Sequence, residues 1–239
     1  MKGIIKKKLN IGIIGAGNIG GALTRHFTRL GHDVVVANSR GPATLADLAK
    51  ETGAKPVPVS EAARGRDLVV VTIPEGKIPE LPPGLFKNAP ANLIVVDTGN
   101  YYPQQRDGKI DGIENGMLES RWAEQQLGHP VVKAFNNIYA EHLATHGKPP
   151  GTPGRIALPV SGDDPESKKV VMGLVDAMGF DPVDAGGIDE SWRQQPGTPV
   201  YATDFDAAGV RRALANATTQ RKPEWRATPK SPGDFTAPA

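Results

Sequence analysis

The sequence predicts an α/β protein built on a doubly wound parallel sheet. Short apolar runs alternate with helical patterns up to about residue 145, and a glycine-rich turn separates the first predicted strand from the first predicted helix. Strands that alternate with helices require right-handed crossovers, which place helices on the faces of a parallel sheet. The apolar runs are continuous rather than alternating, which is typical of strands buried on both faces.

The first strand, helix and strand occupy residues 11–40. An apolar run at residues 11–14 predicts a strand, and residues 33–37 predict the next one. Between them, apolar residues recur at helical spacing, and Gly31 follows the last of them as a stop signal. The residues that carry this helical pattern are Ile19, Leu23, Phe27 and Leu30.

The glycines of this unit have the spacing of a dinucleotide-binding motif. Gly15 allows a tight turn, Gly17 lets a pyrophosphate approach the backbone, and Gly20 lets the helix pack closely. Such glycines also occur in purely structural turns, but here strand, motif, helix and strand follow in order. We therefore predict that a pyrophosphate binds at the helix N-terminus. The predicted contacts are Gly15, Ala16, Gly17, Asn18, Ile19 and Gly20.

The tip of the second strand indicates which nicotinamide dinucleotide binds. An NAD site usually carries an acid there, about 20 residues past the motif, whereas this chain has Asn38, Ser39 and Arg40. Arg40 can pair with a 2′-phosphate and Ser39 can donate to it. These three residues predict a site for NADP(H), although Arg40 could instead belong to a solvated turn.

Five further elements are expected before residue 145. They are a helix at 42–50, a short strand at 57–59, and buried strands at 67–73 and 93–97, followed by another strand at 131–135. Residues 74–92 contain five prolines, so any helix there should be short or irregular. We assign residues 1–145 to an NADP-binding domain.

Residues 146–239 form the predicted C-terminal α/β extension, which completes the sheet and the cleft. Strands are expected at 156–160 and 181–184, on either side of a helix over 165–178. Asp163 or Asp164 can cap that helix and Gly179 can end it. A proline-rich tail begins at Pro223.

Polar and turn-forming residues follow the central strands. The carboxyl ends of parallel strands meet at one edge of the sheet, where ligands of this architecture bind. We therefore predict that these residues contact the ribose or nicotinamide, although asparagine also suits an ordinary turn. They are Thr72, Ile73 and Pro74 after one strand, Asn100 after the next, and Ala134, Phe135 and Asn136 after the third.

The sequence identifies no catalytic residue. The chain has no cysteine, which excludes disulfides, thiolate metal sites and a cysteine nucleophile, and no metal site is expected. None of its tyrosines has a lysine four residues later, as a Tyr-x-x-x-Lys proton donor requires. Lys133 and Asn137 have the spacing of the catalytic pair of β-hydroxyacid dehydrogenases, which keeps a 3-hydroxyacid or pyrroline-type reductase as an alternative.

This shortage of acid and base groups favours one type of chemistry. Hydride transfer between a nicotinamide and a flavin-like ring depends mainly on stacking the two rings in the correct orientation. A small-molecule or flavin-like hydride acceptor is therefore expected. The alternative from another class is a non-catalytic NADP(H)-binding or redox-sensing protein.

Composition limits the partners. The formal net charge is +2, and apart from Lys6-Lys7-Lys8 the basic residues are dispersed, so no nucleic acid is expected. No run approaches 18 apolar residues, so we expect no membrane association and a cytoplasmic location. Dimers are common in this architecture, and a homodimer is one expected assembly.

Several of these segments resemble one family. The chain is similar, over about residues 9–205, to the NADP oxidoreductases that depend on the deazaflavin coenzyme F420, and more closely to their bacterial dinucleotide-binding branch. The resemblance rests on Gly15 to Gly20, Asn38 to Arg40, Val71 to Pro74 and Val131 to Asn137, and for the bacterial branch on Asp97 to Pro103 and Glu190 to Pro199.

The resemblance implies a Rossmann fold with an NADP(H) site. Residues 16–19 would bind the pyrophosphate, and Ser39 and Arg40 the 2′-phosphate. Thr72, Pro74 and Ala134 would lie beside the ribose and nicotinamide. The acceptor ring would stack on the nicotinamide in a cleft lined by Asn100, Phe135, Asn136 and residues 192–196. Residues 133–137 and the tail from Trp192 depart from the deazaflavin enzymes, which leaves the acceptor open.

Overall fold

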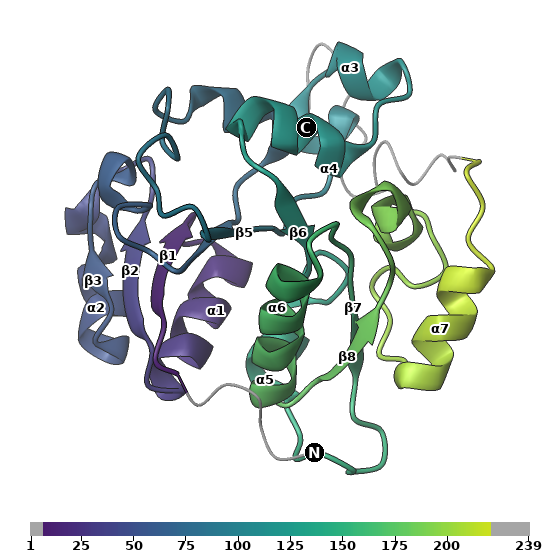
Figure 1. Cartoon of the computed structure of the whole chain (residues 1–239). Helices are drawn as coiled ribbons and strands as arrows, with labels where there is room; N and C mark the ends of the chain where they lie inside the picture. The colour runs from purple at the N-terminus through teal and green to yellow at the C-terminus, as the bar shows by residue number, and fades with distance from the viewer. Residues whose placement is uncertain (1–6, 221–239) are drawn as a thin grey trace.

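The computed structural model describes residues 7–220 and contains one six-stranded parallel sheet (Figure 1). Its strand order is β3-β2-β1-β4-β5-β6, so the chain reverses direction across the sheet between β1 and β4. This order confirms the doubly wound Rossmann fold. The strands are β1 (Asn10–Ile14), β2 (Asp33–Ala37), β3 (Lys55–Pro56), β4 (Leu68–Val71), β5 (Ile94–Asp97) and β6 (Val131–Lys133).

Alternate residues of the central strands point to opposite faces of the sheet and form two cores. On one face, Ile13 and Val70 pack with residues of α1, α5 and α6. On the other face, Val69 and Val95 pack with Phe86 and other residues of irregular segments. The helices are α1 (Asn18–Arg29), α2 (Ala46–Thr52), α3 (Asp111–Glu114), α4 (Glu119–Leu127), α5 (Ala140–Thr145), α6 (Pro165–Ala177) and α7 (Ala207–Ala215).

Short 3₁₀ and π-helical turns lie in the connections between these strands and helices. As expected for a proline-rich segment, residues 74–92 contain no α-helix and only the 3₁₀ helix η3. The short helical turns are η1 (Pro42–Leu45), η2 (Val59–Glu61), η3 (Glu75–Glu80), the π-helical turn η4 (Pro103–Asp107) and η5 (Ile188–Gln194). Within residues 7–220, no helix is long and apolar enough to cross a membrane.

Two predicted elements differ in type or position from those observed. The predicted helix at 42–50 is the 3₁₀ turn η1 followed by α2, which ends at Gly53 in the left-handed region. The short strand predicted at 57–59 lies two residues earlier, as β3, and Val59 instead begins η2. β3 pairs with β2 through only two residues, so the register of β2 sets its position.

The strands predicted at 67–73 and 131–135 end earlier than expected. β4 stops at Val71 and β6 at Lys133, and the next residue of each, Thr72 and Ala134, donates a last backbone hydrogen bond to the neighbouring strand. Phe135 adopts a φ of 63°, which a strand cannot accommodate. The cofactor contacts predicted after β4 and β6 therefore lie in loops beyond these strands.

The C-terminal part forms a second, two-stranded parallel sheet beside the first. It pairs β7 (Ala157–Val160) with β8 (Asp181–Asp184), and Ser161 forms an antiparallel bridge to Lys133 at the end of β6. Figure 1 shows β7, β8 and α7 at the β6 side of the molecule. The predicted cap of α6 is confirmed, since Asp164 accepts a 2.9 Å hydrogen bond from the backbone of Ser167. The domain boundary at residues 145 and 146 stays a prediction.

Candidate dinucleotide site

The glycine turn between β1 and α1 leaves no room for side chains at two of its three glycines. Gly15 has a φ of +108°, and a Cβ there would collide with the carbonyl oxygen of Thr72. A Cβ on Gly20 would collide with the carbonyl oxygen of Gly15 and would lie 2.8 Å from a side-chain carbon of Thr72. These two glycines therefore bring α1 close to β1 and β4.

Gly17 differs from the other two because it faces open space. A Cβ on Gly17 would meet nothing within 4 Å. Gly17 is also the N-cap residue of α1, where no side chain caps the helix and no acid lies in the first turn. Free backbone N–H groups and an open approach suit a pyrophosphate, so the residues present fit a dinucleotide at this end of α1.

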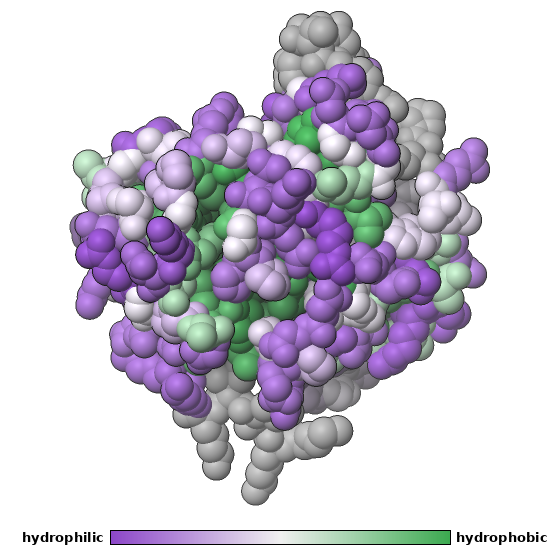
Figure 2. Space-filling model, turned by 45° about the horizontal axis from the view of Figure 1, so that its top comes forward, coloured by the Kyte–Doolittle hydropathy of each residue, from purple (hydrophilic) through white to green (hydrophobic). Residues whose placement is uncertain are grey.

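A cavity of about 720 Å³ opens beside this turn. Figure 2 shows hollows on this molecule in which hydrophobic residues are visible between hydrophilic rims. The cavity brings together three groups of predicted cofactor contacts, from the ends of β1, β2 and β4. These are Gly15, Ala16 and Gly17, then Asn38, Ser39 and Arg40, and then Thr72, Ile73 and Pro74.

The same cavity is lined by residues that the sequence did not single out. Lys77, Glu80 and Leu81 reach it from η3 and the residue that follows it, and Val59 reaches it from η2. Lys77 forms an exposed 2.7 Å ion pair with Glu80. Their segment is rich in proline and has no helical or strand periodicity, so no pattern could have predicted which side chains face the cavity.

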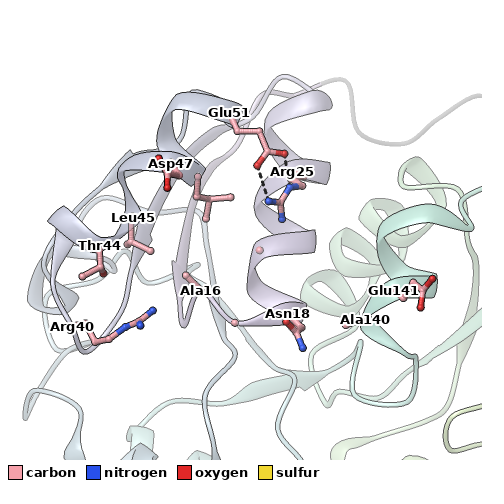
Figure 3. A pocket seen from close by; sticks show the side chains of 13 residues that line it. Ala16, Asn18, Arg25, Arg40, Thr44, Leu45, Asp47, Glu51, Ala140 and Glu141 are labelled. Atoms are coloured by element: carbon pink, nitrogen blue, oxygen red, sulfur yellow. Dashed lines mark hydrogen bonds and ion pairs between the residues drawn. The ribbon is translucent and has the colours of Figure 1, made fainter.

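A second cavity, of about 630 Å³, lies on the other side of the α1 N-terminus (Figure 3). Ala16, Gly17, Asn18 and Arg40 line it, together with residues of α2 and α5. The Arg40 side chain points from its loop toward the residues at the start of α1. Two arginines line this cavity. Arg25 forms a 2.6 Å ion pair with Glu51, whereas Arg40 forms no ion pair among the described residues.

The tip of β2 is held in shape by Asn38. Its Oδ1 accepts a hydrogen bond from the backbone N–H of Arg40 at 3.1 Å, and its Nδ2 donates to Thr44 at 2.9 Å. Ser39 and Arg40 remain exposed. Asn38 therefore orders the loop, and the two residues after it are left available to a ligand.

The residues predicted at the nicotinamide end are less open. Ala134, Phe135 and Asn136 are at most 4% exposed, and the side chain of Phe135 belongs to the apolar core. None of the five described cavities includes them or Asn100. Of the group, Asn100 alone is half-buried rather than buried.

Three ionisable side chains are buried just beneath the carboxyl edge. Lys133 donates a 2.7 Å hydrogen bond to Asp97 and lies 3.9 Å from a carboxyl oxygen of Glu75, and all three side chains are at most 1% exposed. Neither carboxyl oxygen of Glu75 has a hydrogen-bond partner among the described residues. A Cβ on Gly99 would collide with this carboxyl group, so Gly99 makes room for it.

The environment favours a neutral Glu75 and a charged Lys133. Burial raises the pKa of the Glu75 carboxyl well above its ordinary value, and the negative charge of Asp97 raises it further. Burial lowers the pKa of Lys133, but the negative charge of Asp97 and its hydrogen bond help to outweigh this and leave the pKa raised. Lys133 is thus a buried cation held by Asp97, a placement that does not suit the general acid of the 3-hydroxyacid reductase alternative.

Asn137, which the 3-hydroxyacid reductase alternative pairs with Lys133, is also buried. Asn137 is 1% exposed, and neither atom of its amide group has a described hydrogen-bond partner. No described cavity brings Lys133 and Asn137 together at a surface that a substrate can reach.

The structure also joins two tyrosines that no sequence pattern paired. The hydroxyl groups of Tyr102 and Tyr201 share a short hydrogen bond, and the guanidinium of Arg106 lies 5.6 Å from the centre of the Tyr102 ring. Burial raises the pKa of both phenols, so both stay protonated at neutral pH. The contact ties the segment after η5 to the loop after β5.

Comparison with known proteins agrees with this geometry. The model of a family described as NADP oxidoreductase, coenzyme F420-dependent, matches residues 10–101. The protein YjhV of Escherichia coli K12 is 49% identical over 86 residues, which are 36% of this chain and 61% of that protein. The matched segment therefore spans less than two thirds of this curated relative.

Solved structures extend the similarity beyond residues 10–101. The hypothetical protein SMa0349 of Sinorhizobium meliloti superposes with a TM-score of 0.69 at 31% identity, covering 83% of this chain and 96% of that one. A candidate F420-dependent NADP reductase of Arthrobacter sp. FB24 superposes with a TM-score of 0.64 at 23% identity, covering 77% and 87%. The second likeness is one of fold.

Proposed function

The chain belongs to the family of coenzyme F420-dependent NADP oxidoreductases, and we propose that it transfers a hydride between NADPH and a flavin-like or other two-electron acceptor. The family match and the Rossmann sheet support an NAD(P)-dependent oxidoreductase. The choice of NADP(H) and the type of acceptor are the finer parts of the proposal.

The β2 tip carries the proposal for NADP(H). Ser39 and Arg40 are exposed where the two cavities at the α1 N-terminus adjoin, and Asn38 holds their loop in shape. No acid occupies the tip, where an NAD site would bind both ribose hydroxyls. A guanidinium can pair with both charged oxygens of a 2′-phosphate, which supports a preference for the phosphorylated cofactor.

The lining of the cavities supports a ring-stacking acceptor. Among the described residues, no histidine or tyrosine lines either cavity at the α1 N-terminus. The bound dinucleotide would supply the hydride, and the chain's own groups would hold the pyrophosphate, the ribose and the ring. Catalysis would then come mainly from orientation, which a planar two-electron acceptor can exploit.

An acceptor panel tests this function. Purified protein is mixed with NADPH or NADH and with deazaflavin, free flavins, ferric chelates or quinones, and the loss of reduced-nicotinamide absorbance is followed. We expect oxidation of NADPH with at least one planar acceptor, and much slower oxidation of NADH. Absence of NADPH oxidation with every acceptor would contradict the enzyme assignment, and equal rates with NADH would contradict the cofactor preference.

One observation favours a second candidate, a non-catalytic NADP(H) sensor. Ala134, Phe135 and Asn136 are buried, and Asn136 is hydrogen-bonded to Gln194 of the C-terminal part. A structure with NADP⁺ separates the two candidates. An enzyme needs the C4 face of the nicotinamide open to a pocket, whereas a sensor can leave it covered.

A further inference from the structure

A chain of side-chain amides connects the C-terminal part of the fold to the carboxyl edge of the main sheet. Ser161 donates to Gln194 at 2.9 Å, Gln194 donates to Asn136 at 2.9 Å, and Asn136 donates to Asn100 at 3.1 Å. Gln194 is fully buried and Asn136 is 4% exposed, so water does not compete for these bonds. The chain ends at the half-buried Asn100.

Backbone carbonyls fix the orientation of Asn136 and Gln194. Asn136 Nδ2 lies 2.8 Å from the backbone oxygen of Gln194, which can only accept, so the amide nitrogen must be on that side. Gln194 Nε2 lies 3.5 and 3.4 Å from the backbone oxygens of Lys133 and Pro159, which places its donor there for the same reason. The opposite orientation of either amide would set oxygen against oxygen.

A backbone carbonyl also fixes the orientation of the Asn100 amide. Its Nδ2 donates to the backbone oxygen of Asn136 at 2.8 Å, and its Oδ1 accepts from Asn136 Nδ2. These bonds use one of its two N–H groups and one of its two lone-pair positions. Asn100 therefore keeps one free N–H donor and one free acceptor position, which point to opposite sides of its amide plane.

Asn100 lies where the nicotinamide end of a dinucleotide would reach. The β2 tip would hold the adenosine phosphate and the β1 turn the pyrophosphate, and β5, which Asn100 follows, is the second strand past β1. Two strand spacings are about 10 Å, a distance that half of a dinucleotide can span. The oxygen of a nicotinamide carboxamide can accept a hydrogen bond from the free N–H of Asn100, or its amino group can donate one to the free acceptor position.

We propose that Gln194 is a positioning residue that holds Asn136, and through it Asn100, in the orientation that recognises the carboxamide of the nicotinamide. This inference rests on the proposed function. It gives Gln194, at the end of η5 in the C-terminal part, an indirect effect on how the cofactor's reactive ring is placed.

Two ligands test the inference by calorimetry on the full chain: NADP⁺, and 2′-phospho-ADP-ribose, which lacks the nicotinamide. We expect Gln194→Ala and Asn100→Ala each to weaken NADP⁺ binding about tenfold while leaving the fragment within about twofold of the wild type. The double variant should be no weaker than Asn100→Ala alone, because Gln194 acts through Asn100. Gln125→Ala, on the exposed face of α4, is the matched control and should change neither affinity.

Gln194→Ala removes a fully buried side chain, so two milder variants accompany it. Gln194→Met keeps the length of the side chain but cannot donate to Asn136. Ser161→Ala removes one hydrogen bond from the end of the chain. Both variants should show the same selective loss. Equal losses of affinity for both ligands, or no loss of affinity in any variant, would overturn this inference but not the proposed function. If the wild type binds neither ligand, the proposed function itself fails.

Discussion

The ammonium group of Lys133 donates a 2.7 Å hydrogen bond to the carboxylate of Asp97, and both side chains are 1% exposed. The two residues are register partners at the ends of β6 and β5, so the sheet itself brings them together. The loops that carry Asn100 and Ala134 begin immediately after these two residues. The pair thus anchors the edge of the sheet on which the proposed nicotinamide site is built.

Replacing Lys133 should cost stability. Lys133→Met leaves Asp97 as a buried charge without a partner, which typically destabilises a fold by about 3–5 kcal/mol. The double variant Lys133→Met/Asp97→Asn should recover part of the loss, because it removes both charges. Urea unfolding followed by circular dichroism measures both. A single variant as stable as the wild type, but without turnover, would instead support Lys133 as a general acid.

Glu75 should make stability fall as the pH rises. Its pKa is raised in the folded state by burial and by Asp97, with Lys133 opposing and Glu119 and Asp107 adding to the rise. Above the ordinary value of 4.5 the unfolded chain loses this proton while the folded chain keeps it. The unfolded state then binds fewer protons, so the free energy of unfolding decreases with pH up to the folded pKa.

Glu75→Gln removes this titration and keeps the shape of the side chain. The stability of Glu75→Gln relative to the wild type should therefore increase with pH above about 4.5, as measured by urea unfolding at a series of pH values. Parallel stability curves for the two proteins would show that Glu75 does not titrate in this way.

Gly17 and Gly20 should respond differently to the same substitution. Gly20→Ala forces a Cβ onto the backbone of Gly15 and should destabilise the fold by about 1–3 kcal/mol. Gly17→Ala meets nothing in the protein, so its stability should stay within about 1 kcal/mol of the wild type. Its methyl group would instead occupy the approach of the pyrophosphate, and NADPH binding should weaken about tenfold or more. Unchanged NADPH affinity in Gly17→Ala would place the pyrophosphate elsewhere.

Arg40 should distinguish the two nicotinamide cofactors. A hydrogen-bonded contact to a charged group contributes about 1.5–3 kcal/mol, so Arg40→Gln should weaken NADPH binding about tenfold or more and leave NADH binding nearly unchanged. Arg64→Gln is a suitable control, because Arg64 is also exposed and lines none of the described cavities. Equal effects of Arg40→Gln on both cofactors would argue for a solvated turn arginine.

Local patterns in the chain were sufficient to predict the main architecture. The glycine spacing from Gly15 to Gly20, the continuous apolar runs and the helix caps report steric and solvation demands that act over a few residues. They placed every strand of the main sheet within a few residues, and they located the β2 tip. Boundaries were less accurate at β3, β4 and β6, where pairing with a neighbour, rather than propensity, ends the strand.

The partners of the buried polar groups required the folded structure. Lys133 and Asp97 are 36 residues apart, and Gln194 and Asn136 are 58 residues apart. The pairing of these polar groups depends on strand order, on register and on the packing of the C-terminal part against the β6 edge. None of these features produces a periodic pattern in the sequence. A buried polar group must find its hydrogen bonds inside the protein, so these long-range contacts, and the orientation of Asn100 that follows from them, were set by packing in three dimensions.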